Sequence, residues 1–247
     1  MAKNPQPNVA KANAKVIENP PHKLTDAIRN PALMVLLGDV HGKRLLDLGC
    51  SNGESSRKLQ ALGAIVTGAD YSADQIELAK SHEDGIDYIL TEEGSKLALK
   101  SANFDVVTYF SMRATEHLDE MLAESSRVLK KSGKILLSVL HPSFIGAGRK
   151  LIKAQDGSVG IFVNHYFTEE MRLNPQHQSG ANQAKVSNLI RNHTVSDYIN
   201  KVIQSGFVIQ HVQEPRATDL AQLNDAEINF WSTHAARYLI IMASKVK

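Results

Sequence analysis

A loop with two glycines and a nearby acid is the part of this chain whose residue types and spacing can do chemistry. The run Leu45–Leu48 is apolar except for Asp47, Gly49 follows it, and Gly53 comes four residues later. Glycine permits a positive φ and leaves no Cβ between the backbone and a ligand. A strand, a glycine turn and then a helix pattern present the first ligand loop of a doubly wound sheet. The loop is therefore predicted to bind a nucleotide-type ligand.

The charges near this loop distinguish between such ligands. A dinucleotide fingerprint reads G-x-G-x-x-G, whereas this loop reads Gly49-x-x-x-Gly53 with Asp47 two residues before the first glycine. A carboxylate repels a pyrophosphate and attracts an ammonium group. Asp70 ends the next apolar run, where an acid accepts hydrogen bonds from ribose hydroxyls. The two acids together predict a nucleoside joined to a cationic amino acid.

Further motifs follow in order, and with them the chain resembles the class I S-adenosylmethionine (SAM) dependent methyltransferases, in the small-molecule branch called methyltransferase type 11. The matching segments are Leu45–Gly53, Asp70–Ser72, Phe104–Val107, Glu116–Leu118, Val128–Lys134, Thr194–Tyr198, Gly206-Phe207 and Glu214–Arg216. Ser51 departs from the commonest loop, which has a glycine there, although a small residue still allows close approach of the backbone. The motifs are specific for the family and weak for the substrate.

The resemblance implies SAM as the cofactor, with S-adenosyl-L-homocysteine as its product. It also implies an α/β fold with a doubly wound, seven-stranded, mostly parallel, Rossmann-like sheet and an inserted cap after the fifth strand. We expect Asp47 to face the methionine amino group, Asp70 to hold the ribose, and either Glu92 or Glu93 to face the adenine. The full set of expected cofactor-binding residues is Asp47, Gly49, Ser51, Gly53, Asp70, Tyr71, Glu92, Glu93 and Phe110.

Alternating strand and helix patterns supply the elements that would position these residues. The predicted strands are Arg44–Leu48, Ala64–Ala69, Ile86–Leu90, Phe104–Phe110, Lys134–Leu140, Phe207–Val212 and Ala236–Ala243. The predicted helices are Ser55–Leu62, one capped by Ser72 and running to Ser81, one from Thr115 or Glu116 to near Lys131, and one capped by Thr194 and ending at Gly206. Two earlier helices are expected at Val9–Glu18 and from Leu24 or Pro31 to Leu37.

This pattern divides the chain into an N-terminal arm and one domain, and the domain contains a long insertion. Residues 1–42 are predicted to form an N-terminal helical arm, either a lid over the cofactor or a frayed segment. Residues 43–247 are predicted to form the methyltransferase domain. Within it, residues 142–192 form a long excursion that begins at the carboxyl edge of the sheet, and long excursions are usually functional. We expect this excursion to be the cap that binds the acceptor. Trp231, in a second short insertion, is expected in the core.

Methyl transfer explains why the sequence shows no dense catalytic cluster. A sulfonium methyl group is already activated, so positioning does most of the work, and a base is needed only where the acceptor carries a proton. His117 and His141 follow the fourth and fifth strands and are the candidate bases or orienting groups, with a solvent-facing or turn role as the alternative for each. The candidate acceptor-binding residues, in or beside the cap, are His165, Tyr166, Arg191 and His193.

Composition and missing motifs disfavour several other classes, including proteins that act on nucleic acid. With 28 basic and 26 acidic residues the chain lacks the charge excess of a nucleic-acid-binding protein. The sequence Tyr109–Met112 replaces the Asn-Pro-Pro-Tyr step that related methyltransferases of base amines carry. Neither a metal-ligand motif, a membrane-length apolar run nor a signal peptide in Met1–Pro21 is present. We expect a cytoplasmic protein with a small-molecule substrate, and Cys50, the single cysteine, to pack the loop rather than act as a nucleophile.

Three functions stay open at this point. The favoured one is a methyltransferase that transfers a methyl group from SAM to the oxygen, nitrogen or carbon atom of a small organic acceptor. A non-catalytic or regulatory SAM-binding protein would keep the same two acids. A nucleotide-dependent oxidoreductase is less favoured, because the dinucleotide fingerprint is missing.

Overall fold

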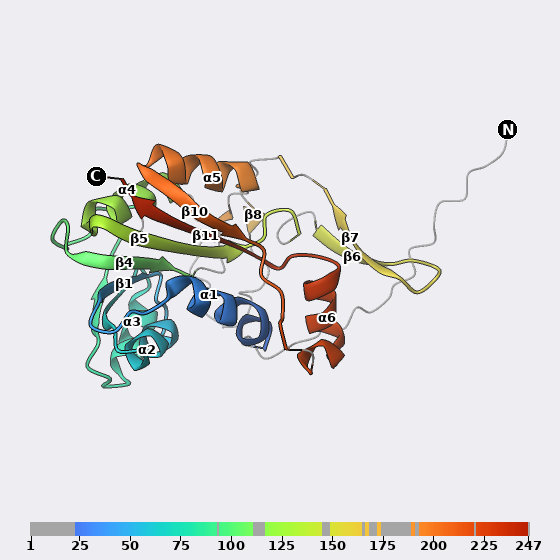
Figure 1. Cartoon of the computed structure of the whole chain (residues 1–247), viewed down its shortest axis with the longest axis horizontal. Helices are drawn as coiled ribbons and strands as arrows, with labels where there is room; N and C mark the ends of the chain where they lie inside the picture. The colour runs from blue at the N-terminus through green and yellow to red at the C-terminus, as the bar shows by residue number, and fades with distance from the viewer. Residues whose placement is uncertain are drawn as a thin grey trace.

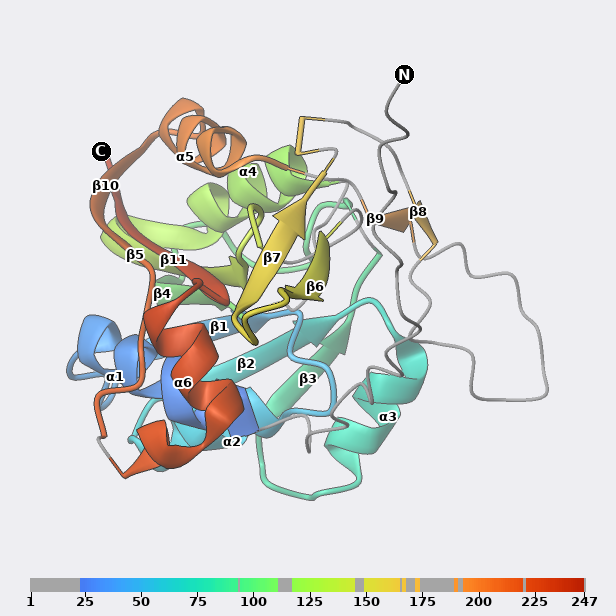
Figure 2. The same ribbon diagram turned by 90° about the vertical axis from the view of Figure 1, so that its right-hand side faces the viewer.

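A seven-stranded sheet with helices on both faces forms the body of the molecule (Figures 1 and 2). The computed structural model describes residues 23–92, 94–110, 117–144, 149–164, 166–167, 172–173, 189–190, 193–219 and 221–246. From one edge to the other the strands are β10 (Phe207–Gln213), β11 (Tyr238–Lys245), β5 (Leu129–Leu140), β4 (Phe104–Tyr109), β1 (Arg44–Leu48), β2 (Ile65–Asp70) and β3 (Asp87–Leu90). All seven predicted strands are present.

The direction of the strands places the ligand edge. β3, β2, β1, β4 and β5 run parallel, while β11 is antiparallel to both β5 and β10. The chain passes from β1 outward to β2 and β3, then crosses back to β4 on the other side of β1. The loops after β1 and β4 therefore lead in opposite directions, and ligands of doubly wound sheets bind at such a switch point. The predicted doubly wound, mostly parallel sheet is confirmed.

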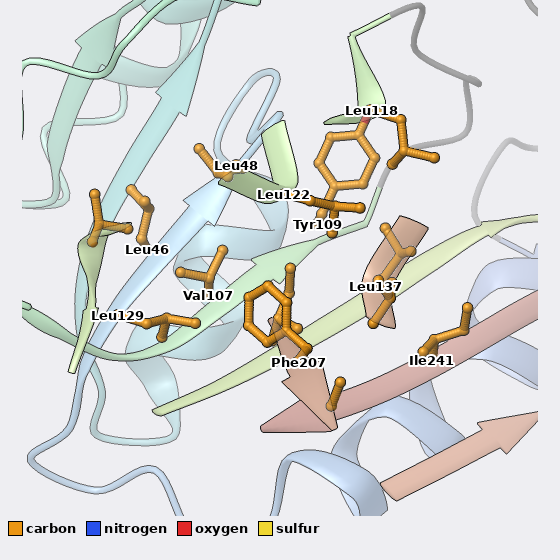
Figure 3. Packing of buried hydrophobic residues seen from close by; sticks show 14 of the residues in the cluster. Leu46, Leu48, Val107, Tyr109, Leu118, Leu122, Leu129, Leu137, Phe207 and Ile241 are labelled. Atoms are coloured by element: carbon orange, nitrogen blue, oxygen red, sulfur yellow. The ribbon is translucent and has the colours of Figure 1, made fainter. Parts of the chain in front are cut away.

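The helices bury one apolar layer on each face of the sheet. Figure 1 shows α4 (Leu118–Val128) and α5 (Val195–Gln204) on one face, and α1 (Asn30–Leu37), α2 (Glu54–Ala61) and α3 (Ala73–Lys80) on the other. Leu46 belongs to the first layer and its neighbour Leu45 to the second, and both are fully buried. Figure 3 shows the first layer, to which Leu46 of β1, Val107 of β4 and Leu137 of β5 all belong. Burial on both faces explains why these strands are continuously apolar.

Two helix boundaries test the predicted capping residues. Thr194 caps α5 as predicted: its hydroxyl accepts the Asp197 N–H (3.1 Å), and the Asp197 carboxylate accepts the Thr194 N–H (2.7 Å). Ser72 is the first residue before α3, but its side chain makes no capping bond. The predicted end of the helix near Lys131 is wrong. α4 ends at Val128 because Leu129 takes an extended conformation and begins β5, which carries an irregularity opposite Phe104 and Val106.

The N-terminal helical segment begins near Leu24, the earlier of the two predicted starting positions. A π-helical turn, η1 (Thr25–Arg29), leads directly into α1, which ends at Gly38 with φ +66°. Leu24 and Ile28 of this segment are buried in a third apolar cluster with Trp231 and Tyr238. The expected core position of Trp231 is therefore confirmed. The helix expected at Val9–Glu18 lies outside the described residues.

The excursion after β5 contains strands that the sequence did not predict. β6 (Arg149–Lys153) and β7 (Val159–Val163) form an antiparallel hairpin, which extends from the body at the right of Figure 1. β8 (Arg172–Leu173) and β9 (Leu189–Ile190) form a second short pair. After β10 the chain adds η3 (Gln222–Asn224) and α6 (Ala226–Thr233) before returning as β11. Within the described part of the chain, no helix has the length and apolar character needed to cross a bilayer.

Candidate functional site

The loop after β1 is wound through three left-handed residues. Gly49, Ser51 and Gly53 have φ values of +68°, +51° and +79°. The N–H groups of Gly49 and Cys50 both donate to the Ala69 carbonyl oxygen, at 2.7 and 3.1 Å, which ties the loop to the end of β2. A left-handed conformation costs an ordinary residue about 1–2 kcal/mol. Ser51, the departure from the usual glycine, therefore stands at a position that favours glycine.

Tyr88 of β3 explains why the loop needs its second glycine. A Cβ added at Gly53 would lie 2.3 Å from the Tyr88 hydroxyl oxygen, and one added at Gly68 of β2 would lie 2.6 Å from the Tyr88 ring. The Tyr88 hydroxyl donates to Asp84 at 2.9 Å, which fixes the ring in this position. Sequence reasoning did not find Tyr88, and its place in a short predicted strand was the only signal.

Asp47 lies at the centre of the site and is 1% exposed. Its Oδ2 accepts the hydroxyls of Ser55 (2.6 Å) and Ser56 (2.7 Å), and its Oδ1 accepts the Thr108 hydroxyl (3.0 Å). Burial raises the pKa of Asp47, and the three hydroxyl donors act in the opposite direction. These three donors were missed by the sequence reasoning, although two serines that open the helix after the loop were a visible signal.

Asp70 joins the loop after β1 to the turn after β2. It is 8% exposed, and its two oxygens accept the N–H groups of Ser51 and Ser72, each at 2.9 Å. In the register of β1 with β2, Leu48 pairs with Ala69, so Asp70 stands just beyond the end of the ladder. Tyr71, the next residue, is exposed. The two predicted acids thus lie on adjacent strands, on either side of the glycine loop.

The remaining predicted cofactor residues lie at the ends of β3 and β4. The side chain of Glu92 is exposed, and its carbonyl oxygen accepts the N–H and hydroxyl of Ser95; Glu93 lies outside the described residues. Phe110, directly after β4, is half-buried. The Arg29 guanidinium carbon lies 5.7 Å from the Phe110 ring centre. Arg29 was missed by the sequence reasoning, because nothing in the N-terminal pattern indicates that it reaches β4.

Comparison with known proteins agrees with this geometry. The family model for the methyltransferase domain matches residues 46–137, from β1 to β5. The crystal structure of an S-adenosylmethionine dependent methyltransferase from Mesorhizobium loti superimposes with a TM-score of 0.74 at 25% identity, covering 87% of this chain and 96% of that one. A Listeria monocytogenes protein assigned to the same class gives a TM-score of 0.72 at 27% identity, covering 88% and 96%. The methyltransferase family model thus matches the central sheet of this chain, and the fold is that of the class I SAM-dependent methyltransferases, type 11-like.

Curated relatives of this chain differ in how much of it they match. An uncharacterized protein of Haemophilus influenzae is 28% identical over 241 residues, which is 92% of this chain and 91% of the relative. A ubiquinone biosynthesis O-methyltransferase of Bartonella bacilliformis is 31% identical over 121 residues, which is 46% of this chain. The match spans only about half (48%) of that O-methyltransferase.

His141 is buried, and both of its ring nitrogens have partners. Nε2 lies 2.7 Å from Oε1 of Glu214, and Nδ1 accepts the Ser143 N–H at 3.2 Å. Since Nδ1 accepts, Nε2 carries the proton and donates it to Glu214 in the neutral ring. Burial lowers the pKa of His141, while Glu214 acts to raise it. The arrangement fixes the orientation of the ring at the end of β5.

The other predicted acceptor-side residues lie in separate places. The His117 ring packs against Gly94, in the loop after β3, and its Nδ1 is 3.9 Å from Oε1 of Glu120. The Tyr166 hydroxyl accepts the Val195 N–H at 3.0 Å. His193 is buried, with its ring edge-on to Tyr198 of α5. The structure therefore places Tyr166 and His193 near the start of α5. The Arg149 guanidinium lies over the Tyr166 ring at 5.7 Å and donates to the Ser143 carbonyl oxygen, beside His141. His165 and Arg191 lie outside the described residues.

Cys50 follows Gly49 and is buried beneath the loop. Burial raises the pKa of its thiol, and the nearby carboxylates of Asp47 and Asp70 raise it further. A thiol with a raised pKa is a poor nucleophile, because only the thiolate reacts. Cys50 instead packs with Ile76, Ala79 and Tyr88, in agreement with the expected packing role.

Proposed function

We propose that this protein transfers a methyl group from S-adenosylmethionine to a small organic acceptor. The observation that carries the proposal is the pair of buried carboxylates on adjacent strand ends. Asp47 and Asp70 lie on either side of a glycine loop whose backbone is wound for close approach of a ligand. Such a pair suits an adenosine with an attached ammonium group and repels a diphosphate. The match to the methyltransferase family model and the shared fold support the same cofactor.

In this proposal the chain's own residues bind and orient, and the cofactor supplies the activated methyl group. Asp70 accepts the ribose hydroxyls in addition to the two N–H groups that already hold it. Asp47 supplies negative charge on the methionine side, and Tyr71 and Glu92 (or Glu93) complete the adenosine side. Holding acceptor and methyl group about 3 Å apart in line, with water excluded, lowers the barrier by several kcal/mol.

The acceptor side is assigned to the excursion after β5 and to the N-terminal segment. We propose residues 142–192 as the acceptor cap and residues 1–42 as an N-terminal arm or lid, with His165, Tyr166, Arg191 and His193 toward the acceptor. His117 and His141 remain the proposed base or orienting groups; for His141, the Glu214 contact supports an orienting role. The O-methyltransferase relatives favour an oxygen acceptor as the first class to test. A cytoplasmic location is part of the same proposal.

Ligand titration tests the cofactor first. We expect S-adenosylhomocysteine to bind in isothermal titration calorimetry and NAD not to bind; the reverse result would end the methyltransferase assignment and favour an oxidoreductase. Turnover is then measured with labelled SAM against phenols, amines and carboxylic acids. Binding of S-adenosylhomocysteine without methyl transfer to any member of this panel would favour a non-catalytic SAM-binding protein.

The Asp70→Ala variant tests the ribose assignment. Loss of charged hydrogen bonds is expected to weaken S-adenosylhomocysteine binding by about 1–3 kcal/mol. Asp74→Ala is the matched control, since Asp74 is an exposed acid four residues further on, in the first turn of α3. Equal affinities of the Asp70 and Asp74 variants would contradict the role of Asp70.

A further inference from the structure

Arg29 is a buried cation that the proposed function has not used. It is the last residue of η1 and is 9% exposed. Its guanidinium carbon lies 5.7 Å from the ring centre of Phe110 and 5.9 Å from that of Tyr238. Contacts with two aromatic rings restrict the orientation of a guanidinium group, and they favour a cation. Arg29 is therefore held in a defined position rather than free to reach water.

The hydrogen bonds of Arg29 all go to neutral oxygen atoms. Nε and Nη2 donate to the side-chain oxygen of Asn30 at 3.3 and 3.2 Å, and Nη1 donates to the Phe110 carbonyl oxygen at 3.4 Å. All three bonds are long, and both acceptor atoms, Asn30 Oδ1 and the Phe110 carbonyl oxygen, are neutral. Among the residues that the structure describes, no carboxylate forms an ion pair with Arg29.

Arg127 shows how the same protein treats an arginine whose role is structural. Its Nε and Nη2 donate to both oxygens of Glu124 at 2.7–3.1 Å, and its remaining donors reach the carbonyl oxygens of Leu97 and Leu99. A carboxylate bound in this bidentate way is the usual partner of a guanidinium group. Arg29 is more deeply buried than Arg127 and lacks it.

Burial lowers the pKa of Arg29 from its ordinary value, because desolvation penalises the cation. Electrostatic interactions with Tyr238 and with the carboxylates of Asp47, Asp26 and Glu54 act in the opposite direction. A buried charge without a close partner is costly, and the cost is recovered when an anion binds. The unpaired donors of Arg29 and its desolvated charge thus both suit an anionic ligand.

The position of Arg29 puts this anion site at the carboxyl edge of the sheet. Phe110 directly follows β4, and Tyr238 pairs with Leu140, the last residue of β5. Asp47 of β1 is close enough to interact electrostatically with Arg29. A negative and a positive side chain therefore stand beside the end of β1. An amino acid zwitterion has the complementary pair of charges.

We propose that Arg29 binds a ligand carboxylate at this edge of the sheet. The inference rests on the proposed function, which supplies two sources of such a group: the methionine part of the cofactor, or an acidic acceptor. In both cases the planar guanidinium donates two hydrogen bonds to the two carboxylate oxygens. The N-terminal segment then contributes directly to the site, because η1 carries the residue.

Calorimetry with three variants tests the proposal. Arg29→Met removes the charge and keeps an apolar stem, and Arg29→Lys keeps the charge without the fork. Arg44→Met is the matched control, since Arg44 also lies over an aromatic ring, that of Phe104, but at the start of β1. The ligands are S-adenosylhomocysteine and 5′-methylthioadenosine, which lacks the amino acid part.

If the carboxylate belongs to the cofactor, the variants should lose affinity only for the ligand that carries the amino acid part. Arg29→Met should bind S-adenosylhomocysteine roughly 10- to 100-fold more weakly than wild type, with 5′-methylthioadenosine within about twofold, Arg29→Lys in between and Arg44→Met unchanged. An acceptor source predicts unchanged cofactor affinity, together with binding of benzoate or hydroxybenzoate to the protein saturated with S-adenosylhomocysteine, and loss of that binding in Arg29→Met.

A folded Arg29→Met protein that binds S-adenosylhomocysteine and the benzoates as wild type does would overturn the proposal. If that variant does not fold, wild type is titrated with S-adenosylhomocysteine and its decarboxylated analogue, and Arg29→Lys with the same pair and the benzoates. The proposal would also be overturned if wild type and Arg29→Lys lost the same affinity when the ligand lacks its carboxylate. Failure of the proposed cofactor differs from these outcomes, because wild type would then bind neither nucleoside, and failure of catalysis alone would appear only in the turnover assay.

Discussion

The glycine loop after β1 and the β6–β7 hairpin both lie at the carboxyl edge of the sheet, yet they are held in opposite ways. The loop is fixed by buried groups: Asp47 has three hydroxyl donors and Asp70 has two N–H donors. The hairpin exposes large apolar side chains, with Leu151 63% and Phe162 48% exposed. The loop depends on the core, whereas the hairpin depends on a few contacts at its base.

In the proposed function, this difference separates binding of the cofactor from choice of the acceptor. A ligand that every turnover uses benefits from a site that is already in place, because a preorganised site loses little entropy on binding. A segment with few buried contacts opens locally at low cost. In the proposed function the loop would hold SAM constantly, and the hairpin would adjust around the acceptor.

The same substitution, glycine to alanine, can be made in both regions. Gly53→Ala places a Cβ on the Tyr88 hydroxyl and forces alanine into a left-handed conformation (φ +79°). We expect a loss of about 2–4 kcal/mol in the free energy of unfolding, from the backbone strain and the overpacking together. Urea denaturation measures this loss, and calorimetry should show that S-adenosylhomocysteine no longer binds.

Gly157→Ala in the hairpin turn is the matched variant. Its φ is +87°, and a Cβ there meets no atom within 4 Å. Only the backbone term remains, so the expected loss is about 1–2 kcal/mol, with affinity for S-adenosylhomocysteine unchanged. Equal losses in the two variants would show that the loop is not packed more tightly than the hairpin.

A second prediction uses the burial of Asp47. Its pKa is raised in the folded protein, so the folded state binds the proton more tightly than the unfolded state. The stability from this group is complete below the unfolded pKa and is lost as the pH rises through the folded pKa. Relative to Asp47→Asn, the wild type should therefore gain stability as the pH falls from neutral into that window, measured by urea denaturation at several pH values.

Asp105 provides a control, because its pKa is shifted in the opposite direction to that of Asp47. Burial alone would raise the pKa of Asp105, but the Lys130 ammonium and the Arg44 N–H hold it below its usual value. Its stabilising contribution is present above the unfolded pKa and is lost as the pH falls through the folded pKa. Asp47→Asn and Asp105→Asn should thus change the pH dependence in opposite directions. If both substitutions changed the pH dependence of stability in the same direction, the raised pKa of Asp47 would be contradicted.

The loop was predictable from the sequence because its requirements are local. Gly49, Gly53 and the two acids occupy fixed places after apolar strands, and Thr194 stands three residues before the acid that completes its capping box. Local residue types at set spacings are enough to predict such features. The seven strands and the doubly wound, mostly parallel sheet followed from the alternation of strands and helices together with the resemblance to the family.

The contacts that complete the site were not predictable, because they join residues far apart in the chain. Arg29 reaches Phe110 across 81 positions, and His141 reaches Glu214 across 73. Nothing in either local sequence indicates its partner. The hairpin was missed for a related reason: Arg149–Lys153 carries too little alternation of polar and apolar residues to predict a strand, and only pairing with β7 makes it one.

The His141–Glu214 contact, at the base of the excursion, gives a third and smaller effect. Burial lowers the pKa of His141, so the unfolded state binds the proton more tightly, and stability is lost as the pH falls through the unfolded value toward the folded one. Wild type should lose stability relative to His141→Gln as the pH falls below about 6.5. At pH 7.5 the variant should cost about 0.5–1.5 kcal/mol through its lost hydrogen bonds.

Glu214→Gln checks the cause of this pH dependence. Glu214 opposes the effect of burial on His141, so removing its charge should steepen the loss of stability at low pH. A shallower dependence in Glu214→Gln would mean that burial of His141 is not the dominant influence on its pKa.

The smallest expected effect comes from Arg149, at the base of the hairpin. Its guanidinium donates to the carbonyl oxygens of Pro142 (2.7 Å), Ser143 (3.0 Å) and Asn164 (2.6 Å). Arg149→Met should lower the melting temperature by no more than about 2 °C, because the hairpin shares little of the core. Amide hydrogen exchange in residues 149–163 should nevertheless become roughly tenfold faster, since local opening loses these bonds.

Lys150→Met is the control for Arg149, because Lys150 is the exposed neighbour on the opposite face of the hairpin and pairs with Phe162. It should leave exchange in the hairpin unchanged. If Arg149→Met instead lowered the melting temperature as much as Gly53→Ala does, the hairpin would unfold together with the sheet. The acceptor side would then be as rigid as the cofactor side, and acceptor choice would have to come from the shape of a fixed site.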